Sequence, residues 1–315
     1  MSGRRTAFWL VLAVLFLGAC ALSLLVGPGG PGALTDARIA GIRVMRMLLG
    51  ILAGGVLGIC GASLQGLLRN PLADPFTLGT ASGAVFGVSI PVALGVGSSL
   101  VLPASGFAGA LLATLAVYSL ARVRARVTTT GLVLAGVIAG FFFSGLVMLF
   151  IVLSHRPLGQ AVYLLMGYIG TPFTTRSAFL FGVCSIVALA GCGLLVTFGR
   201  ELDIMSGSTE TAQSLGVDTG ERTRDVFMLT SLLTGIVVSF TGAISFVGLV
   251  VPHLVRLSIG PRHASLLPAS FLAGSALLLV ADVLARNVVS GGLPLSVVTA
   301  FLGVPFFIYL LRSRL

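Results

Sequence analysis

The feature that constrains this chain most is a series of apolar runs, most of them about twenty residues long, separated by short polar joints. A helix of that length spans the hydrocarbon core of a bilayer and satisfies its backbone hydrogen bonds internally, as a membrane-spanning segment must. Only 9% of the 315 residues are charged, against about 25% in soluble proteins. We therefore expect an all-α polytopic membrane protein in which residues 1–315 form one transmembrane domain.

Arginine carries all of the positive charge, because the 19 basic residues include no lysine. The arginines lie one to three at a time between apolar runs and form no stripe, so the sequence does not predict nucleic-acid binding. A P-loop requires the lysine of GxxxxGK[ST], so this chain is not itself a P-loop ATPase. The four cysteines lie within apolar runs and lack metal-ligand spacing, so we expect neither a disulfide nor a metal site. They are Cys20, Cys60, Cys184 and Cys192.

The first apolar run follows Arg4 and Arg5, which leaves three interpretations. A twin-arginine signal and a lipoprotein signal cleaved at Cys20 are two of them, but about twenty apolar residues favour an uncleaved first helix. We expect ten spans, of which the third and the eighth are short, and a short surface helix between residues 155 and 176. The expected spans are 7–26, 47–68, 76–95, 100–120, 131–153, 178–198, 226–247, 254–259, 266–285 and 293–311.

The arginine distribution fixes the expected orientation. With a cytoplasmic N-terminus and ten crossings, thirteen arginines lie inside and six outside, as the positive-inside rule requires. We therefore expect a multi-pass protein of the bacterial cytoplasmic (inner) membrane with both termini in the cytoplasm.

A cluster of polar residues interrupts the second apolar run. Gln65, Arg69, Asn70 and Asp74 accompany two prolines there, and broken helices at membrane depth occur only where protein or a water-filled cavity satisfies the backbone. We expect a second break at Pro252 and His253. Corresponding breaks in the two halves suggest a weak inverted repeat relating helices 2–5 to helices 7–10, with the permeation route near the breaks.

The longest polar segment, residues 200–224, contains signals for a short helix. Ser208 can cap its start, Glu210 lies in its first turn, and Gly216 can end it after Leu215. A helix this short is marginal in water, so we expect it to dock on another protein surface.

Several motifs, in order from about residue 40 to the end, resemble the FecCD-type ABC permeases. The first half contains RVMR (43–46), GASLQ (61–65), RNPLADP (69–75) and LGTASGA (78–84). The second half contains SLGV (214–217), ISFVGLVVPH (244–253), GPRH (260–263), LLPAS (266–270), ADVLAR (281–286) and LPLSVVTAFLGVPFF (293–307).

The resemblance implies a type II ABC importer permease fold and a translocated metal chelate, most often iron(III)–siderophore, with haem and cobalamin as alternatives. It implies a second permease subunit, a homodimer being favoured over a heterodimer, and two cytoplasmic ATPase subunits. A periplasmic or lipid-anchored substrate-binding protein would dock outside. The chain itself would be no enzyme and would bind no cofactor, since ATP and Mg²⁺ belong to the ATPase and the metal arrives inside its chelator.

Site residues follow from the matching motifs. The resemblance places ATPase coupling at Thr209, Glu210, Ala212, Gln213, Ser214, Leu215, Gly216 and Val217. It places binding-protein docking at Arg43, Arg46 and Arg286, because arginine binds carboxylates in a bidentate way. It places the pathway and its gate at Gln65, Asn70, Pro71, Thr128, Thr129, Thr130, Pro252 and His253.

Structural roles compete with several of these assignments. Gln65 and Asn70 could simply bond neighbouring helices, His253 could hold the helix break, and Arg286 could pair with Asp282 four residues earlier. Two departures from the family pattern are Val44-Met45 in place of Leu-Pro and Gly292 in place of a glutamate. The rival function is a secondary transporter driven by ions through Asp282, which would need no ATPase.

Overall fold

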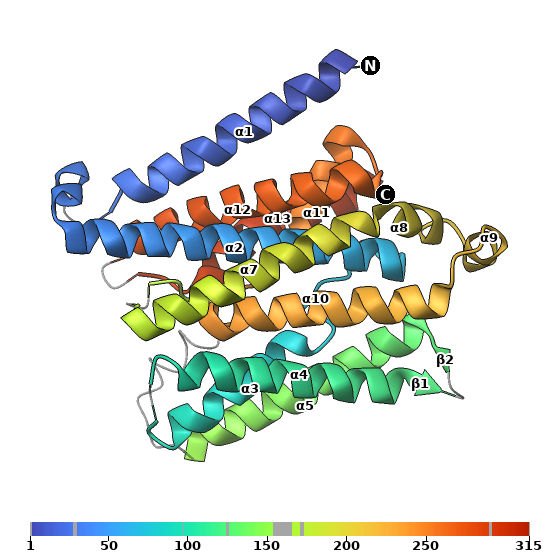
Figure 1. Cartoon of the computed structure of the whole chain (residues 1–315), viewed down its shortest axis with the longest axis horizontal. Coiled ribbons are helices and arrows are strands. Elements are labelled where there is room, and N and C mark those ends of the chain that lie inside the picture. The colour runs from blue at the N-terminus through green and yellow to red at the C-terminus, as the bar shows by residue number, and fades with distance from the viewer. Residues whose placement is uncertain are drawn as a thin grey trace.

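The computed structural model is a bundle of long helices with short helices at one end (Figure 1). It describes residues 2–27, 30–96, 98–123, 126–153, 166–170, 173–289 and 292–314. The first half of the described chain contains α1 (Ser2–Leu25), the 3₁₀ helix η1 (Pro31–Thr35), α2 (Ala37–Leu68), α3 (Thr80–Ala93), α4 (Val101–Ala121), the strands β1 (Arg122–Val123) and β2 (Arg126–Val127), and α5 (Thr129–Leu153). The second half contains α7 (Thr175–Thr197), α8 (Gly199–Met205), α9 (Thr209–Ser214), α10 (Thr219–Thr241), α11 (Val247–Ile259), α12 (His263–Val288) and α13 (Leu295–Arg314).

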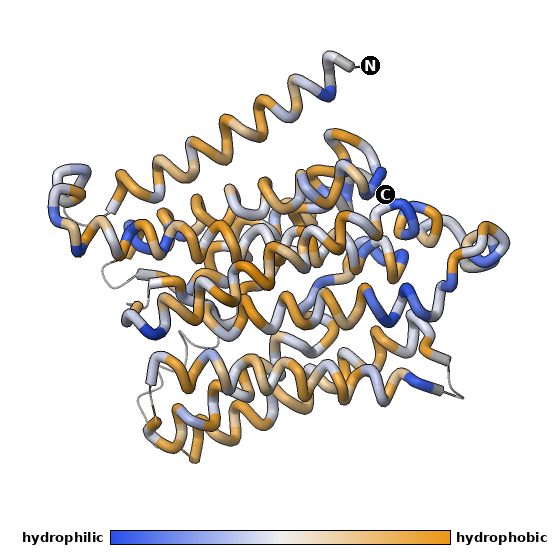
Figure 2. Tube along the Cα trace, viewed as in Figure 1, coloured by the Kyte–Doolittle hydropathy of each residue, from blue (hydrophilic) through white to orange (hydrophobic). Residues whose placement is uncertain are grey.

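The described residues contain ten apolar helices, which matches the ten spans predicted from the sequence. Seven of them are long and apolar enough to cross a membrane, and three are shorter: Thr80–Ala93, Val247–Ile259 and Leu295–Ile308. Figure 2 shows hydrophobic residues along the helices and hydrophilic residues gathered mainly near their ends. The surface helix expected between residues 155 and 176 falls largely outside the described residues.

The second helix begins ten residues earlier than predicted. Asp36 caps α2 by accepting a hydrogen bond from the backbone N–H of Arg38, so Arg43 and Arg46 lie within the helix. The prediction placed the start at Met47, directly after the arginines, and charged residues inside a membrane-spanning helix are costly. The contacts that these two arginines make, described below, explain why the helix tolerates them.

The second helix break was predicted at the wrong residue. The chain leaves helical geometry between Gly242 and Phe246, both of which have positive φ (67° and 69°), and Pro252 lies inside α11. Proline disfavours a helix interior because it lacks an N–H and its ring crowds the carbonyl four residues earlier. In α11 that carbonyl belongs to Gly248, and the Gln65 side chain of α2 donates the hydrogen bond that Pro252 cannot.

The centre of the bundle is the close packing of α2 against α12. A Cβ atom on Gly54 would overlap the carbonyl oxygen of Gly274, and a Cβ atom on Gly274 would overlap that of Gly54. One turn along, a Cβ atom on Gly58 would overlap the carbonyl oxygen of Ser270. Small residues of this kind let membrane helices approach until their backbones touch.

One end of the bundle gathers the segments on which the coupling and gate predictions fall. The described ends of the chain, α8, α9 and the β1–β2 hairpin all lie at this end, whereas η1 and the start of α2 lie at the other (Figure 1). We refer to these as the α9 end and the η1 end. The two ends correspond to the faces predicted to be cytoplasmic and external, respectively.

Candidate functional site

The predicted docking helix is present as α9. The Ser208 hydroxyl accepts a hydrogen bond from the Thr211 N–H at 3.0 Å, and Gly216 ends the turn after Leu215 with a φ of 82°. Both capping predictions are confirmed. α9 projects from the end of the bundle (Figure 1), and 63% of the Leu215 side chain is exposed. Within the set expected to couple, Ala212 is buried and Leu215 is exposed, and a contact with a partner stays a prediction.

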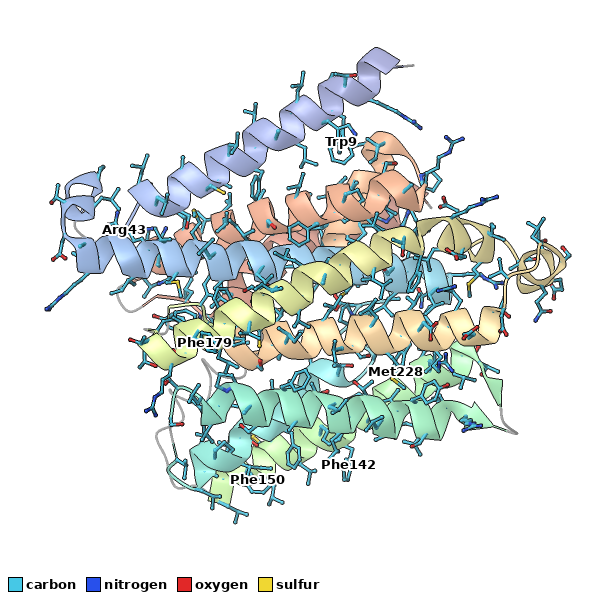
Figure 3. All side chains as sticks on the ribbon, in the orientation of Figure 1. Trp9, Arg43, Phe142, Phe150, Phe179 and Met228 are labelled. Atoms are coloured by element: carbon cyan, nitrogen blue, oxygen red, sulfur yellow. The ribbon has the colours of Figure 1, made fainter. Side chains whose placement is uncertain are left out.

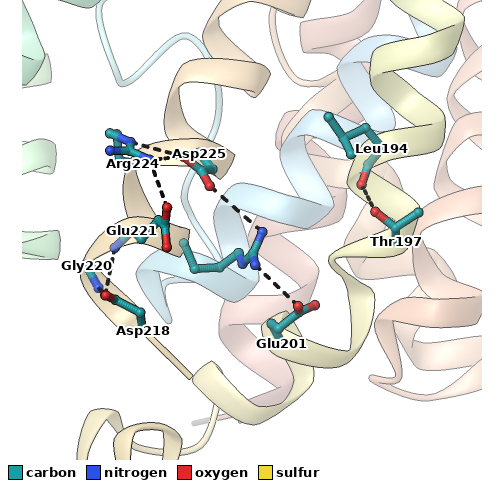
Figure 4. Close-up of polar contacts among 9 residues, drawn as sticks. Leu194, Thr197, Glu201, Asp218, Gly220, Glu221, Arg224 and Asp225 are labelled. Carbon is teal, nitrogen blue, oxygen red and sulfur yellow. Dashed lines mark hydrogen bonds and ion pairs between the residues drawn. The ribbon is translucent and has the colours of Figure 1, made fainter. Parts of the chain in front are cut away.

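The sequence analysis missed α8, the short helix that precedes α9. It treated residues 200–224 as one polar connection, whereas 199–205 are helical and 219–224 belong to α10. Leu202 and Met205 bury the inner face of α8 in the hydrophobic core. At its start, the Arg222 guanidinium lies 4.2 Å from the centre of the Phe198 ring. It also lies 3.4 Å from the carboxylate of Glu201, which Figure 4 labels.

The predicted gate residues lie at the start of α5. The Thr128 hydroxyl accepts a hydrogen bond from the Gly131 N–H at 3.0 Å, while Thr129 and Thr130 form the first helical turn. The hairpin of β1 and β2 precedes them directly, and this segment lies at the α9 end (Figure 1). A role as a gate stays a prediction.

The first helix break begins where the sequence places it. Arg69 caps the C-terminus of α2 in the left-handed conformation, with a φ of 49°. The Asn70 side chain then accepts a hydrogen bond from the Leu72 N–H, and the Asp74 side chain accepts one from the Phe76 N–H. Asn70 and Asp74 therefore hold the turn that returns the chain toward α3. Pro71, between them, is exposed.

Gln65 makes the interhelical contact that was considered as its alternative role. Its side-chain amide donates to the carbonyl oxygens of Gly248 and Leu249 at 3.3 and 3.2 Å, and its own carbonyl accepts from Arg256 at 3.2 Å. In a regular helix the N–H of residue 252 would donate to the Gly248 carbonyl. Pro252 has no N–H, so this carbonyl is left without its helical donor. Gln65 is thus buried between α2 and α11.

His253, the neighbour of Pro252, is buried against α13. Its ring lies 5.9 Å from the ring of Phe306 and 6.4 Å from that of Phe307, measured between centroids. Both phenylalanines come from the last apolar motif of the sequence.

The three arginines predicted to dock a binding protein come together at the η1 end. Arg43 is only 4% exposed and donates to the carbonyl oxygens of Leu24 and Gly30 at 2.7 and 3.1 Å; Figure 3 labels it where α1 leads into α2. Arg286 donates to the Ser23 carbonyl at 2.6 Å. Both guanidiniums thus bind the carbonyls at the C-terminal end of α1, where the helix dipole favours cations.

Arg46 instead forms a buried ion pair with Asp282. Its Nε lies 2.9 and 3.0 Å from the two carboxylate oxygens and its Nη2 lies 2.6 Å from one of them. Asp282 is 1% exposed, and Arg286 approaches it at 3.8 Å. The sequence anticipated the Arg286 contact but not the bidentate pair with Arg46. Docking through these arginines stays a prediction.

The two helix breaks meet at one cavity of about 450 Å³. The first break contributes Phe76 and Thr77, and the second contributes Ala243. One face of α5 forms most of the remaining wall of the cavity, and Phe141 on that face is 78% exposed. The wall is mainly apolar with a few hydroxyl groups, which suits a bulky solute more than a bare ion. The remaining lining residues are Ser82, Val85, Gly136, Val137, Gly140, Ser144, Val147, Met148 and Ile151.

Known proteins resemble the chain over nearly its whole length. It is 40% identical to the cobalamin import system permease protein BtuC of Halobacterium salinarum, over 87% of this chain and 73% of that protein. It is 36% identical to the vitamin B12 import system permease protein BtuC of Salmonella paratyphi A, over 98% and 96% of the two chains. A solved structure described as an inward-facing conformation of a metal-chelate type ABC transporter matches with a TM-score of 0.85 and 29% identity, over 96% of this chain and 97% of that one.

The fold is therefore that of a type II ABC importer permease. The model of the FecCD transport family matches residues 5–313. The chain belongs to the FecCD transport family.

Proposed function

We propose that this chain is the membrane-spanning permease subunit of an ABC importer that carries a bulky metal chelate. The observation that carries the proposal is the apolar cavity of about 450 Å³ at which both helix breaks meet. The two named relatives import cobalamin, which is a cobalt chelate, and the matching solved structure is described as metal-chelate type. Ferric siderophores, cobalamin and haem are all bulky metal chelates, so they are the candidate substrates in this proposal.

Partners complete the transporter in this proposal. Two ATPase subunits contact α9 through Leu215 and hydrolyse ATP, since this chain has no lysine for a P-loop. A second permease subunit, a copy of this chain in the simplest case, covers the exposed face of α5 around Phe141. A substrate-binding protein docks at the η1 end. The chain contributes the pathway and binds no cofactor of its own.

Replacing Leu215 with arginine tests the proposal. The complex would be purified with its ATPase and binding protein, and ATP hydrolysis and uptake of cobalamin, a ferric siderophore and haem would be measured in proteoliposomes. A charge at the exposed tip of α9 should abolish most of the hydrolysis that the binding protein stimulates. Ser258→Arg adds the same charge to the exposed last turn of α11 and should leave stimulation unchanged.

Two results would contradict the proposal. Stimulated hydrolysis that survives Leu215→Arg would exclude α9 as the coupling helix. Uptake that persists after ATP depletion would favour the ion-coupled transporter, in which Asp282 would have to leave its bidentate contact with Arg46.

A further inference from the structure

The position of α8 is set by its contacts, because a helix of seven residues is not stable in isolation. Only residues 206–208 separate it from α9. Any force that a partner exerts on α9 therefore acts on α8 almost directly. The contacts of α8 with the bundle decide which long helices receive that force.

The contact with α12 is the best-defined of these. One carboxylate oxygen of Asp203 accepts the backbone N–H of His263 at 2.8 Å and lies 2.6 Å from the Nδ1 atom of the same residue. His263 is the first residue of α12, where backbone N–H groups have no partner within the helix and an acid is favoured. Asp203 thus caps α12 and holds its first side chain.

The His263 ring also contacts α2. The ring is 96% buried, and its second nitrogen, Nε2, has no hydrogen-bond partner among the described residues. A Cβ atom on Gly66 would overlap that nitrogen, so the ring fits against α2 only because residue 66 has no side chain. The imidazole is wedged between the Asp203 carboxylate of α8 and the backbone of α2.

Two further contacts hold the ends of α8. The Arg69 side chain, at the C-terminus of α2, donates to the Met205 carbonyl at 2.8 Å. Arg222 of α10 contacts Phe198 and Glu201 at the start of α8. Arg222 and Glu201 are both partly exposed, so their ion pair contributes little. The Asp203–His263 contact combines a charge-assisted hydrogen bond with a buried ring, so it ties α8 to both α12 and α2.

We propose that Asp203 and His263 are positioning residues that transmit the movement of α9 into α2 and α12. This inference rests on the proposed function, in which an ATPase subunit moves α9. α2 and α12 touch backbone to backbone at Gly54 and Gly274, so a displacement at His263 acts on the two helices together. α8 is then the mechanical link between ATPase and pathway.

Asp203→Ala, Asp203→Asn and His263→Ala test the inference in the complex with its ATPase and binding protein. Alanine at 203 removes both acceptor contacts, whereas the Asn carbonyl oxygen can still accept from the backbone N–H and from the ring. We expect Asp203→Ala and His263→Ala to lower the substrate transported per ATP hydrolysed by about tenfold, as expected for one lost charge-assisted hydrogen bond. Asp203→Asn should restore most of that ratio, and co-purification with the ATPase should be unchanged.

Glu221→Ala is the matched control, because this exposed acid at the same end pairs with Arg224 of its own helix. Amide hydrogen exchange of the permease alone measures the contact between α8 and α12 without any ATPase. Asp203→Ala should speed exchange in residues 199–205 and at His263. Asp203→Asn should leave the exchange unchanged. Unchanged exchange, or faster exchange with wild-type coupling, would overturn the inference. Absence of ATP-driven uptake by the wild-type complex would instead refute the proposed function.

Discussion

At the scale of single residues, several polar side chains inside this bundle satisfy backbone atoms that the fold leaves without partners. Arg43 and Arg286 bind carbonyl oxygens at the end of α1, and Gln65 binds the carbonyl that Pro252 frees in α11. Buried polar side chains in a membrane protein are usually engaged in this way. Their positions therefore report where the helices are irregular.

Gln65→Leu should destabilise the protein by about 1–2 kcal/mol, because it leaves the Gly248 carbonyl and the Arg256 guanidinium without their partner. The midpoint of thermal unfolding in detergent would measure the change. Gln213→Leu removes the same side chain from the exposed helix α9 and should shift stability by less than about 0.5 kcal/mol. Equal stability of the Gln65 variant and the wild type would show that the amide contributes nothing to the packing of α2 on α11.

Local signals were predictable at this scale, and long-range partners were not. Ser208 and Gly216 act within a few residues of themselves, so capping rules were enough to place α9. Arg46 and Asp282 are 236 residues apart, and nothing in either neighbourhood indicates the other. For the same reason the contacts of the three arginines at the η1 end could not be predicted: Arg43 is buried, and Arg46 and Arg286 are partly buried.

At the scale of elements, glycine determines how closely α2 and α12 pack. The overlaps at Gly54, Gly58 and Gly274 involve backbone atoms, which cannot rotate away as a side chain can. Packing of this kind was predictable from the spacing of Gly54 and Gly58, although the partner helix was not.

Gly54→Ala should force α2 away from α12 and lower stability by about 1–3 kcal/mol, the usual cost of overpacking. Thermal unfolding in detergent would again provide the measurement. Gly182→Ala makes the same change on the exposed surface of α7, where a Cβ atom meets nothing within 4 Å, and should leave the midpoint unchanged or slightly raised. A Gly54 variant as stable as Gly182→Ala would show that the crossing can widen freely.

The ends of elements were harder to predict than their existence. Pro252 is a strong sequence signal for a break, yet the break lies at residues 242–246, where Phe246 adopts a φ of 69°. The Phe246 side chain lies against Gly303 of α13, where a Cβ atom would overlap its ring, so the absence of a side chain at residue 303 leaves room for it. Hydropathy alone cannot show such a contact.

At the scale of the whole molecule, the ends of the bundle differ in what they offer to partners. The α9 end presents a short projecting helix and the hairpin, while the η1 end presents the start of α2 (Figure 1). The sequence predicted which end faces the cytoplasm through the arginine count alone. Partner contacts, by contrast, depend on surfaces that only the assembled fold creates.

Cysteine labelling tests the orientation. Ser214→Cys in α9 should react with a membrane-impermeant thiol reagent only in inside-out vesicles, because a cytoplasmic α9 end is sealed inside right-side-out ones. Asp36→Cys at the η1 end should show the opposite pattern, and the unmodified chain, whose four cysteines are buried or partly buried, is the background control. Reversed labelling of the two variants would invert the topology.

The glycine crossing of α2 and α12 also limits how the sequence can change over time. A larger residue at Gly54 cannot be compensated by a smaller one at Gly274, because no residue is smaller than glycine. The same holds in the other direction. Second-site suppressors of a substitution at either position must therefore arise elsewhere, through changes that move a whole helix, and a genetic screen for revertants would map the contacts that set the spacing between the two halves.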